Sequence, residues 1–172
     1  MQIMTKSTLA ILLFSVAIFC HGAEGKGDVV KVGQAAPDFS GTATDGSTVG
    51  LKSLAGKVVL LNFFATWCGP CMQKMPRIES DVWQKFRDSG VVVLAIGREH
   101  SVDELKKFKE SQKFTFQILA DPKREIYSKY ATAYIPRCYL IGKDGKVKYA
   151  DIGYTTQDFN KLKSAVAAEI KK

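Results

Sequence analysis

The sequence predicts a single α/β domain, and three observations support that prediction. Short apolar runs rich in β-branched and aromatic residues alternate with longer segments of helical periodicity. Asp-Gly turn signals occur at two places between such runs. Behind the N-terminal leader about 150 residues remain, which is enough for one hydrophobic core and too few for two ordinary domains. We therefore expect residues 30–172 to form one domain.

The first 23 residues have the pattern of a secretory signal peptide. Lys6 gives a positive start, and the eleven residues 9–19 form a largely apolar stretch ahead of a small-residue cleavage site. A membrane-spanning helix needs about 20 apolar residues, so this stretch indicates a secretory signal and not a membrane span. We expect residues 1–23 to be removed on export across the inner membrane into the periplasm. Lipid anchoring at Cys20 is less favoured, because the bulky Phe19 precedes that cysteine.

The first part of the domain is expected to hold a hairpin, a buried strand and a long helix. Residues 44–47, Thr-Asp-Gly-Ser, are a tight-turn signal that places a short strand on either side. Residues 58–64 are apolar except for Asn62, which predicts a buried strand. A helix over residues 68–87 should follow, with a kink at Pro76, which has no N–H to donate.

The middle of the domain is expected to add two strands and two helices. Residues 91–96 are an apolar run that predicts a strand. The Ser-x-x-Glu spacing of a capping box begins a helix over residues 101–111. Residues 116–119 predict a further strand, and residues 122–130 predict a helix with proline in its first turn.

The last part is expected to form a hairpin and a C-terminal helix. Residues 138–141 and 147–151 predict two strands, and the Lys-Asp-Gly-Lys sequence at 143–146 is a strong hairpin signal between them. Thr155 and Asp158 have the spacing of a helix cap. A final helix should therefore run to the C-terminus.

The sequence Trp67-Cys68-Gly69-Pro70-Cys71 follows the buried strand and places two thiols at the start of a helix. The N–H groups and dipole of a first helical turn stabilise a thiolate, and the pKa of thiols in such motifs falls to about 3.5–7.5. Cys68 is the expected nucleophile. Cys71, one turn further on the same face, is expected to resolve a mixed disulfide. Pro70 fits the first turn, Gly69 leaves room for a partner's backbone, and Trp67 offers an apolar platform for substrate.

Three other interpretations of these cysteines remain open. A zinc site could use Cys68, Cys71, Cys138 and His100, but the last two stand far apart in the sequence and lack a close partner ligand. A purely structural disulfide would close too short a loop to stabilise the fold by much. A pair of core thiols fits poorly with the flanking tryptophan and the Gly-Pro turn. We expect no metal and no cofactor.

Three stretches, at residues 33–39, 58–71 and 134–141, carry a resemblance to a known family, and the second is highly specific. They resemble the extracytoplasmic thioredoxin-fold proteins of the TlpA/ResA group, which are related to the AhpC/TSA redoxins. The resemblance extends over about residues 32–170. It implies a thioredoxin fold, a central mixed sheet flanked by helices, with an N-terminal β-hairpin extension and an inserted βα element within residues 91–130.

The resemblance also implies an activity, the reduction or isomerisation of protein disulfides outside the cytosol. Its partners would be disulfide-bonded or thiol-bearing proteins and a membrane-linked thiol electron donor, and we favour the reductase direction. It further implies that Pro136 is cis and packs against the CxxC pair, with Ile135 presenting its backbone to the substrate. The residues alone indicate only a proline at the start of a strand.

Four residues near the motif are candidate modulators. Asn62 stands where thioredoxin has an acid that manages the proton of the resolving thiol, so another acid or water takes that role, or Asn62 is simply a core amide. Glu99 is the nearest candidate acid, or else a solvated loop residue. Arg137 could steer an acidic partner or lower the thiolate pKa, or be a surface arginine. Cys138 could be a third redox thiol, although we favour a buried small hydrophobe.

Two other functions compete with dithiol exchange. The entry segment also resembles peroxiredoxins, but their peroxidatic cysteine usually has Thr or Ser three positions before it and Pro seven before, where this chain has Ala65 and Leu61. Because Cys71 is also present, a thiol peroxidase is less favoured. The third candidate is a non-catalytic thioredoxin-fold binding module, whose affinity for a partner would survive loss of either cysteine.

The chain is basic, with a formal net charge of +8 at pH 7. Removal of residues 1–23 deletes Lys6 alone among the charged residues and lowers that charge by one, to +7. Lysine-rich helix faces favour encounters with acidic proteins or an anionic membrane surface. The chain has no basic stripe interleaved with aromatic residues, so we do not expect it to bind nucleic acid. We expect a monomer.

Overall fold

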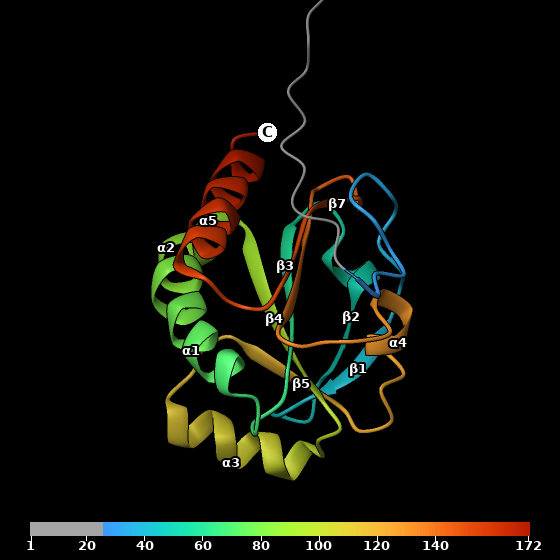
Figure 1. The fold of residues 1–172 in the computed structure, drawn as a ribbon, viewed down its shortest axis with the longest axis vertical. Helices are drawn as coiled ribbons and strands as arrows, with labels where there is room; N and C mark the ends of the chain where they lie inside the picture. The colour runs from blue at the N-terminus through green and yellow to red at the C-terminus, as the bar shows by residue number, and fades with distance from the viewer. Residues whose placement is uncertain (1–25) are drawn as a thin grey trace, which may run out of the picture.

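The computed structural model describes residues 26–172, and within them seven strands form one mixed sheet in the order β2-β1-β5-β4-β3-β6-β7 (Figure 1). The strands are β1 (Ser40–Ala43), β2 (Thr48–Gly50), β3 (Val58–Phe64), β4 (Val91–Arg98), β5 (Gln117–Asp121), β6 (Arg137–Ile141) and β7 (Val147–Ile152). The α-helices are α1 (Gly69–Ile78), α2 (Gln84–Phe86), α3 (Val102–Gln112), α4 (Tyr127–Tyr130) and α5 (Thr156–Ile170). The predicted α/β class is confirmed.

The direction of each strand follows from its connection. β3, β4 and β5 run parallel, because α1 and α3 carry the chain back across the sheet between them. The β1–β2 and β6–β7 pairs are hairpins and therefore antiparallel. β6 also pairs antiparallel with β3, in a register that sets Cys138 opposite Asn62. The central strand thus lies between β4 and the C-terminal hairpin.

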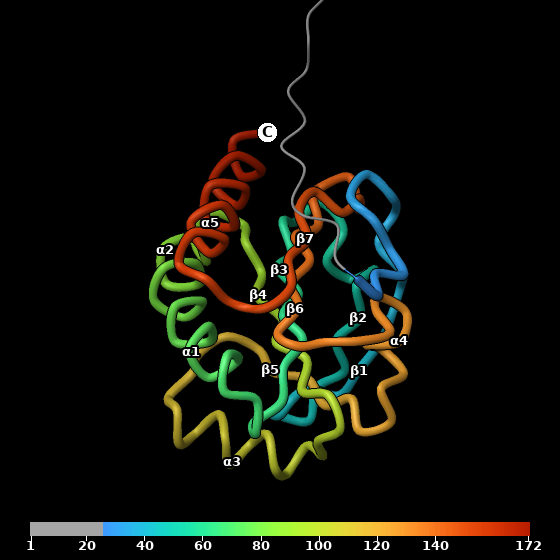
Figure 2. Tube along the Cα trace, viewed as in Figure 1, coloured from blue at the N-terminus to red at the C-terminus, as the bar shows by residue number. Residues whose placement is uncertain are grey.

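Both faces of the sheet are covered, so β3 is buried along its whole length. This explains why its sequence is a continuous apolar run instead of an alternating one. Helices α1 and α5 lie on one side of the sheet and α4 on the other (Figures 1 and 2). The core cluster on the α1 side also includes α3 side chains and contains both CxxC cysteines. The second cluster, on the α4 side, is rich in aromatic rings.

Several local predictions are confirmed by the side chains that form the turns and caps. Asp45 Oδ1 accepts the N–H of Ser47 at 2.9 Å in the turn between β1 and β2. Ser101 and Glu104 form the reciprocal capping box of α3. Thr155 caps α5, and the predicted hairpin between β6 and β7 is present.

The predicted helix over residues 122–130 is wrong for most of its length, because only the four residues of α4 are helical. The carboxylate of Asp121 accepts the N–H groups of Ile126 and Tyr127 at 3.1 and 2.8 Å and so takes the place of backbone carbonyl acceptors. Arg124 has a left-handed φ of +60° within this segment. The side chain of an aspartate, not a helical pattern, therefore organises the turn.

The long helix predicted over residues 68–87 forms, but with three kinds of hydrogen bonding. A π-helical turn, η2 (Glu79–Trp83), separates α1 from α2, and a 3-10 turn, η3 (Arg87–Ser89), ends the segment. Pro76 lies inside α1, where it cannot donate a backbone hydrogen bond. The π-helical hydrogen bonding begins at Glu79, three residues after this proline.

The predicted signal peptide, residues 1–23, and Cys20 lie outside the described residues. The segment from residue 26 onward is attached to the domain by two β-bridges, Asp28 with Ala131 and Ala35 with Lys146. Over residues 26–172, no helix combines the length and the apolar character needed to cross a membrane.

Candidate active site

The junction between β3 and α1 holds a disulfide between Cys68 and Cys71, whose Cα atoms are 5.2 Å apart. Cys68 is the N-cap of α1, and its Sγ accepts the N–H of Cys71 at 3.3 Å. Pro70 occupies the first turn, where its missing N–H leaves no acceptor unpaired. Because a first-turn N–H already points at the sulfur of Cys68, a thiolate formed there on reduction is stabilised.

The two cysteines differ in access. Cys68 is 6% exposed and Cys71 is fully buried. Gly69 and Pro70 between them are exposed, and a Cβ at Gly69 would meet nothing within 4 Å. A partner can therefore approach the sulfur of Cys68 and not that of Cys71, which is the asymmetry that a nucleophile and a resolving thiol require.

Two large aromatic side chains stand out from the segments that form the site. Trp67 is 63% exposed and Tyr134 is 54% exposed. Tyr134 has a positive φ of +68°, an uncommon conformation for a bulky residue, in the loop that leads to Pro136. Exposed rings of this size offer apolar area to an incoming polypeptide.

The peptide bond between Ile135 and Pro136 is cis, as the resemblance implied. Ile135 is half-buried and packs against the core cluster that contains Cys68 and Cys71. The carbonyl of Pro136 accepts the N–H of Gly153 at 2.8 Å. The proline loop is therefore held on the β7 side and lies against the CxxC core.

A buried polar cluster lies on the same face of the sheet as the disulfide. Asn62, Cys138 and Asp151 stand side by side on β3, β6 and β7. Lys74 reaches them from α1, with its Nζ 2.5 Å from Asp151 Oδ1 and 3.3 Å from the carbonyl of Gly153. The Cys138 thiol donates to Asn62 Oδ1 at 3.2 Å. The amide of Asn62 thus binds a thiol, not the backbone.

The surroundings of Cys138 disfavour its thiolate form. Burial raises the pKa of the Cys138 thiol to about 12 and also raises the pKa of the Asp151 carboxyl. Since the thiolate is the form that attacks disulfides, the raised pKa disfavours a nucleophilic role for Cys138 in neutral solution. These contacts favour the buried small hydrophobe over a third redox thiol.

Lys74 and Asp151 were not among the residues predicted for the site. A signal for Lys74 was present, because it lies three residues after Cys71 and shares the buried face of the helix. A lysine in such a place requires a partner. That partner is Asp151 on β7, 77 positions away in the sequence. A local sequence pattern could therefore not identify it.

Glu99, the candidate acid, lies just after β4 and forms an ion pair with Arg98, with 3.1 Å between Oε2 and Nε. Its side chain is 42% exposed. The Arg98 guanidinium also lies over the ring of Trp67, 5.9 Å from its centre. Glu99 therefore pairs with the arginine that packs on Trp67, and this ion pair does not involve Cys71.

The expectation that Arg137 lies at the surface, where it could steer a partner, is wrong, because its side chain is fully buried. Its guanidinium binds the carboxylate of Asp28 and donates to the Tyr139 hydroxyl at 3.3 Å. It also donates to the carbonyls of Lys26 and Ala133, both at 2.8 Å. Arg137 therefore ties the N-terminal segment to the loop before the cis proline.

The nominal zinc ligands are engaged elsewhere. Two of them are joined as the disulfide, Cys138 binds Asn62, and His100 Nε2 accepts the N–H of Thr66 at 3.0 Å. Over the described part of the chain, no group of three His, Cys, Asp or Glu side chains is arranged to hold a metal ion.

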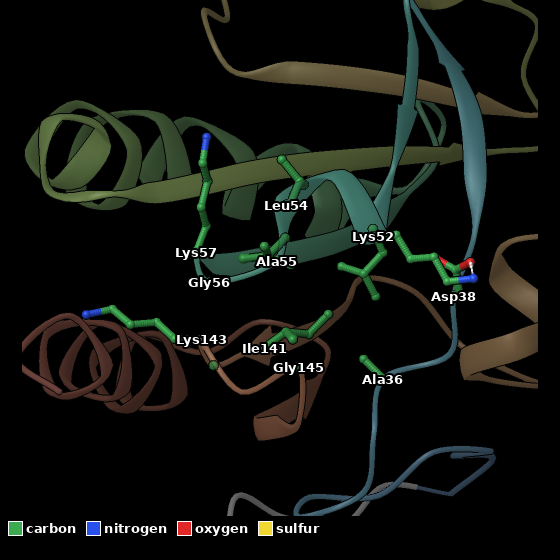
Figure 3. Close-up of a pocket in the computed structure, with 13 residues that line it drawn as sticks. Ala36, Asp38, Lys52, Leu54, Ala55, Gly56, Lys57, Ile141, Lys143 and Gly145 are labelled. Atoms are coloured by element: carbon green, nitrogen blue, oxygen red, sulfur yellow. Dashed lines mark ion pairs between the residues drawn. The ribbon is translucent and has the colours of Figure 1, made fainter.

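A hollow at the opposite end of β3 is separate from this site (Figure 3). It is lined near the start of β3, at Val59, and at the end of β6, at Ile141. An ion pair between Lys52 and Asp38, 3.1 Å long, stands at its edge (Figure 3). None of the predicted site residues lines it.

A mixed sheet with a CxxC disulfide at the N-cap of its first helix and a cis proline beside it defines a thioredoxin-like thiol-disulfide oxidoreductase. Comparison with known proteins gives the same class. The AhpC/TSA family matches residues 32–150, and the chain belongs to this family.

Curated relatives of the chain include proteins named thiol-disulfide oxidoreductase ResA. The one from Bacillus anthracis is 33% identical over 129 residues, which are 75% of this chain and 74% of the relative. The one from Oceanobacillus iheyensis is 31% identical over 159 residues, 89% of this chain and 82% of the relative.

Solved structures that share the fold include proteins from two bacteria. A Bacteroides thetaiotaomicron protein assigned as a protein disulfide isomerase has a TM-score of 0.81 and 38% identity, with 85% of this chain and 94% of that one covered. A Chlorobium tepidum protein assigned as the thiol:disulfide interchange protein DsbE has a TM-score of 0.72 and 29% identity, with 82% and 99% covered. The thioredoxin fold and the thiol-disulfide oxidoreductase activity are therefore established.

Proposed function

We propose that this oxidoreductase works outside the cytoplasm and reduces disulfides of partner proteins, with Cys68 as the nucleophile and Cys71 as the resolving thiol. The observation that carries this assignment is the unequal access of the two sulfurs at the start of α1. The N–H of Cys71 directed at the sulfur of Cys68 supports the same roles. The Gly-Pro dipeptide between them is the one found in thioredoxin, which favours the reductase direction.

The first step forms a mixed disulfide. The Cys68 thiolate attacks one sulfur of the partner disulfide, a new bond forms to that sulfur, and the other partner sulfur leaves as a thiolate. Trp67, Tyr134 and the backbone beside Pro136 are proposed to bind the partner chain. Exposed Gly69 and Pro70 let that chain come close.

The second step releases the reduced partner. Cys71 loses its proton and attacks the sulfur of Cys68, so the mixed disulfide breaks and the second partner thiolate leaves. The partner gains two electrons and takes up two protons, while the cysteine pair is left oxidised. A membrane-linked thiol donor is proposed to return two electrons to the pair for the next cycle.

The proposed location rests on the leader sequence. We propose that residues 1–23 act as a signal peptide that sends the chain to the periplasm, where disulfides persist. Surface lysines would then favour partners with acidic surfaces. The chain is proposed to act as a monomer.

The decisive measurement is the midpoint reduction potential of the Cys68–Cys71 couple, titrated with a dithiol buffer and followed by tryptophan fluorescence. A value of about −270 mV would make the chain a reductase, and one of about −120 mV would make it a disulfide donor and overturn the proposed direction.

Cys68→Ser should abolish exchange, whereas Cys71→Ser should accumulate mixed disulfides with partner proteins. Normal turnover by Cys71→Ser would contradict the dithiol mechanism.

A further inference from the structure

The end of β4 and the segment that follows it contact Trp67 and Thr66, the two residues before Cys68, and His100 makes the hydrogen bond. His100 is 7% exposed, and its Nε2 accepts the N–H of Thr66 at 3.0 Å. The hydroxyl of Thr66 lies 3.3 Å from the same nitrogen. Arg98, at the end of β4, covers the ring of Trp67. The turn that carries the nucleophile is thus held from outside by a segment more than 30 residues away.

The contact with Thr66 indicates which tautomer the neutral ring of His100 adopts. A backbone N–H can only donate, so Nε2 must be the unprotonated nitrogen and Nδ1 must carry the proton of a neutral ring. Nδ1 lies 3.9 Å from Glu104 Oε2. That oxygen is held in place by the N–H and hydroxyl of Ser101, at 2.7 and 2.8 Å. The neutral ring therefore fits between a donor on one side and a carboxylate on the other.

We propose that His100 is a positioning residue whose neutral form holds the active-site turn, and that protonation of His100 releases the turn and slows exchange through Cys68. This inference rests on the dithiol exchange proposed above. A second proton would place an N–H of the ring against the N–H of Thr66, so the hydrogen bond is lost and two donors face each other. Histidine side chains in general change charge between about pH 5 and 8, so the test covers that range.

Loss of this contact weakens a backbone anchor of the turn. The N–H of Cys68, which donates to the carbonyl of Ala65 at 3.1 Å, is another anchor and is left in place. Without the Thr66 anchor, Thr66 and Trp67 can move, and the Cys68 sulfur shifts relative to the N–H of Cys71 that stabilises its thiolate. A single hydrogen bond of ordinary strength corresponds to about a fivefold change in rate.

The charged groups around His100 set the direction of each test. Glu104, from α3, favours the charged ring. Arg98 and Glu99, on the same segment as His100, pair with each other. Asp121, at the end of β5, directs its carboxylate to the N–H groups at the start of α4. Removing the charge of Glu104 should therefore make His100 harder to protonate and move the release to lower pH.

The kinetic test compares the full chain with His100→Gln. The glutamine oxygen can accept the N–H of Thr66 but cannot take up a proton. The rate at which the reduced protein reacts with glutathione disulfide is measured from pH 8 to pH 5 for both proteins. The titration of Cys68 affects both, so it cancels in the ratio of wild-type to variant rates. We expect this ratio to fall about fivefold toward pH 5, and to fall at lower pH in a Glu104→Gln background.

Glu110→Gln is the matched control, because Glu110 is an exposed glutamate on α3, the helix that also carries Glu104. Its ratio to wild type should stay constant across the pH range. A constant ratio for His100→Gln as well would overturn the proposal, since a purely structural histidine gives no such pH dependence.

NMR provides a readout that needs no activity. At pH 7.5 the ¹⁵N shifts of His100 should show a neutral ring protonated on Nδ1, and the Thr66 amide shift should follow the titration of that ring in wild type but not in His100→Gln. A ring protonated on Nε2, or a Thr66 amide insensitive to pH, would overturn the proposal. Absence of exchange at every pH in every variant would instead refute the proposed function, while the NMR result would still decide the role of His100.

Discussion

Each face of the sheet buries one ion pair, and the two pairs differ in how fully their polar atoms are bonded. On the aromatic face, Arg137 binds Asp28 and donates three further hydrogen bonds, and within residues 26–172 only its Nε finds no acceptor. On the disulfide face, Lys74 binds one oxygen of Asp151, while the other oxygen has no hydrogen-bond partner among the described residues. The first pair is close to saturated and the second is not.

This difference separates two kinds of buried charge. A buried polar atom without a partner costs about 1–3 kcal/mol, so it is a poor way to stabilise a fold. The ion pair between Arg137 and Asp28 holds the N-terminal segment in place. Its hydrogen bonds compensate for the cost of burying the two charges. The pair under the disulfide keeps polar groups beside the redox cysteines at a cost in stability, which is where native structures retain such costs.

The largest effect should come from breaking the saturated pair. Arg137→Met removes the buried guanidinium that binds the Asp28 carboxylate, and we expect the free energy of unfolding to fall by about 3–5 kcal/mol. Urea unfolding at pH 7 measures this. Arg87→Met, at a side chain that is 45% exposed, is the control and should change stability by less than about 0.5 kcal/mol. A loss under about 1 kcal/mol for Arg137→Met would show that the pair is not an anchor.

The second effect should depend on pH. Lys74→Met leaves the Asp151 carboxyl, whose pKa burial already raises, without its cation. When the pKa of a carboxyl is higher in the folded state than in the unfolded state, the free energy of unfolding decreases as pH rises through the folded pKa. The variant should therefore be destabilised by about 3 kcal/mol at pH 7.5 and by less at pH 4.5. Urea unfolding at the two pH values tests this, and an equal penalty at both would contradict it.

Removal of the third thiol should have a smaller effect. Cys138→Ala deletes a buried sulfur and its bond to Asn62, so we expect a loss of about 1 kcal/mol in stability. Exchange with glutathione disulfide should keep its rate within about twofold, because the thiol is neutral and takes no part in the chemistry. A tenfold slower exchange in a folded variant would restore Cys138 as a redox residue.

The smallest effect is expected at an ion pair near the surface. Hydrogen bonds from Arg77 lower the pKa of Asp81 to about 2. A carboxyl of lowered pKa contributes stability that is present above its unfolded pKa, about 3.9, and is lost as pH falls through about 2. Asp81→Asn should cost no more than about 1 kcal/mol at pH 7 and clearly less at pH 2. Thermal unfolding across this range measures the cost, and a cost that does not decrease between pH 7 and pH 2 would point to packing instead of charge.

Features set by neighbouring residues could be predicted from the sequence. The capping box at Ser101, the Asp-Gly hairpins and the start of α1 at the CxxC motif all depend on side chains within a few positions of the backbone they organise. The helix predicted over residues 122–130 failed because the carboxylate of Asp121 competes for the N–H groups that a helix would use.

Features that join distant strands could not be predicted in this way. The burial of Arg137 depends on Asp28, 109 residues earlier, and that of Lys74 on Asp151, 77 residues later. The same holds for His100, a nominal zinc ligand by composition, which instead binds the backbone of Thr66. The cis bond before Pro136 was predicted from the family resemblance alone. A proline at the start of a strand does not by itself indicate a cis or a trans bond.

Gly69 sits between the two cysteines with nothing within 4 Å of where a side chain would begin, and its φ is not in the left-handed region. A larger residue can therefore occupy this position without repacking the core. Because the dipeptide between the cysteines influences how readily they give up electrons, single codon changes here should shift the redox poise of the enzyme while its folding stays constant. Natural lineages of this fold thus have a route by which redox chemistry can diverge independently of architecture.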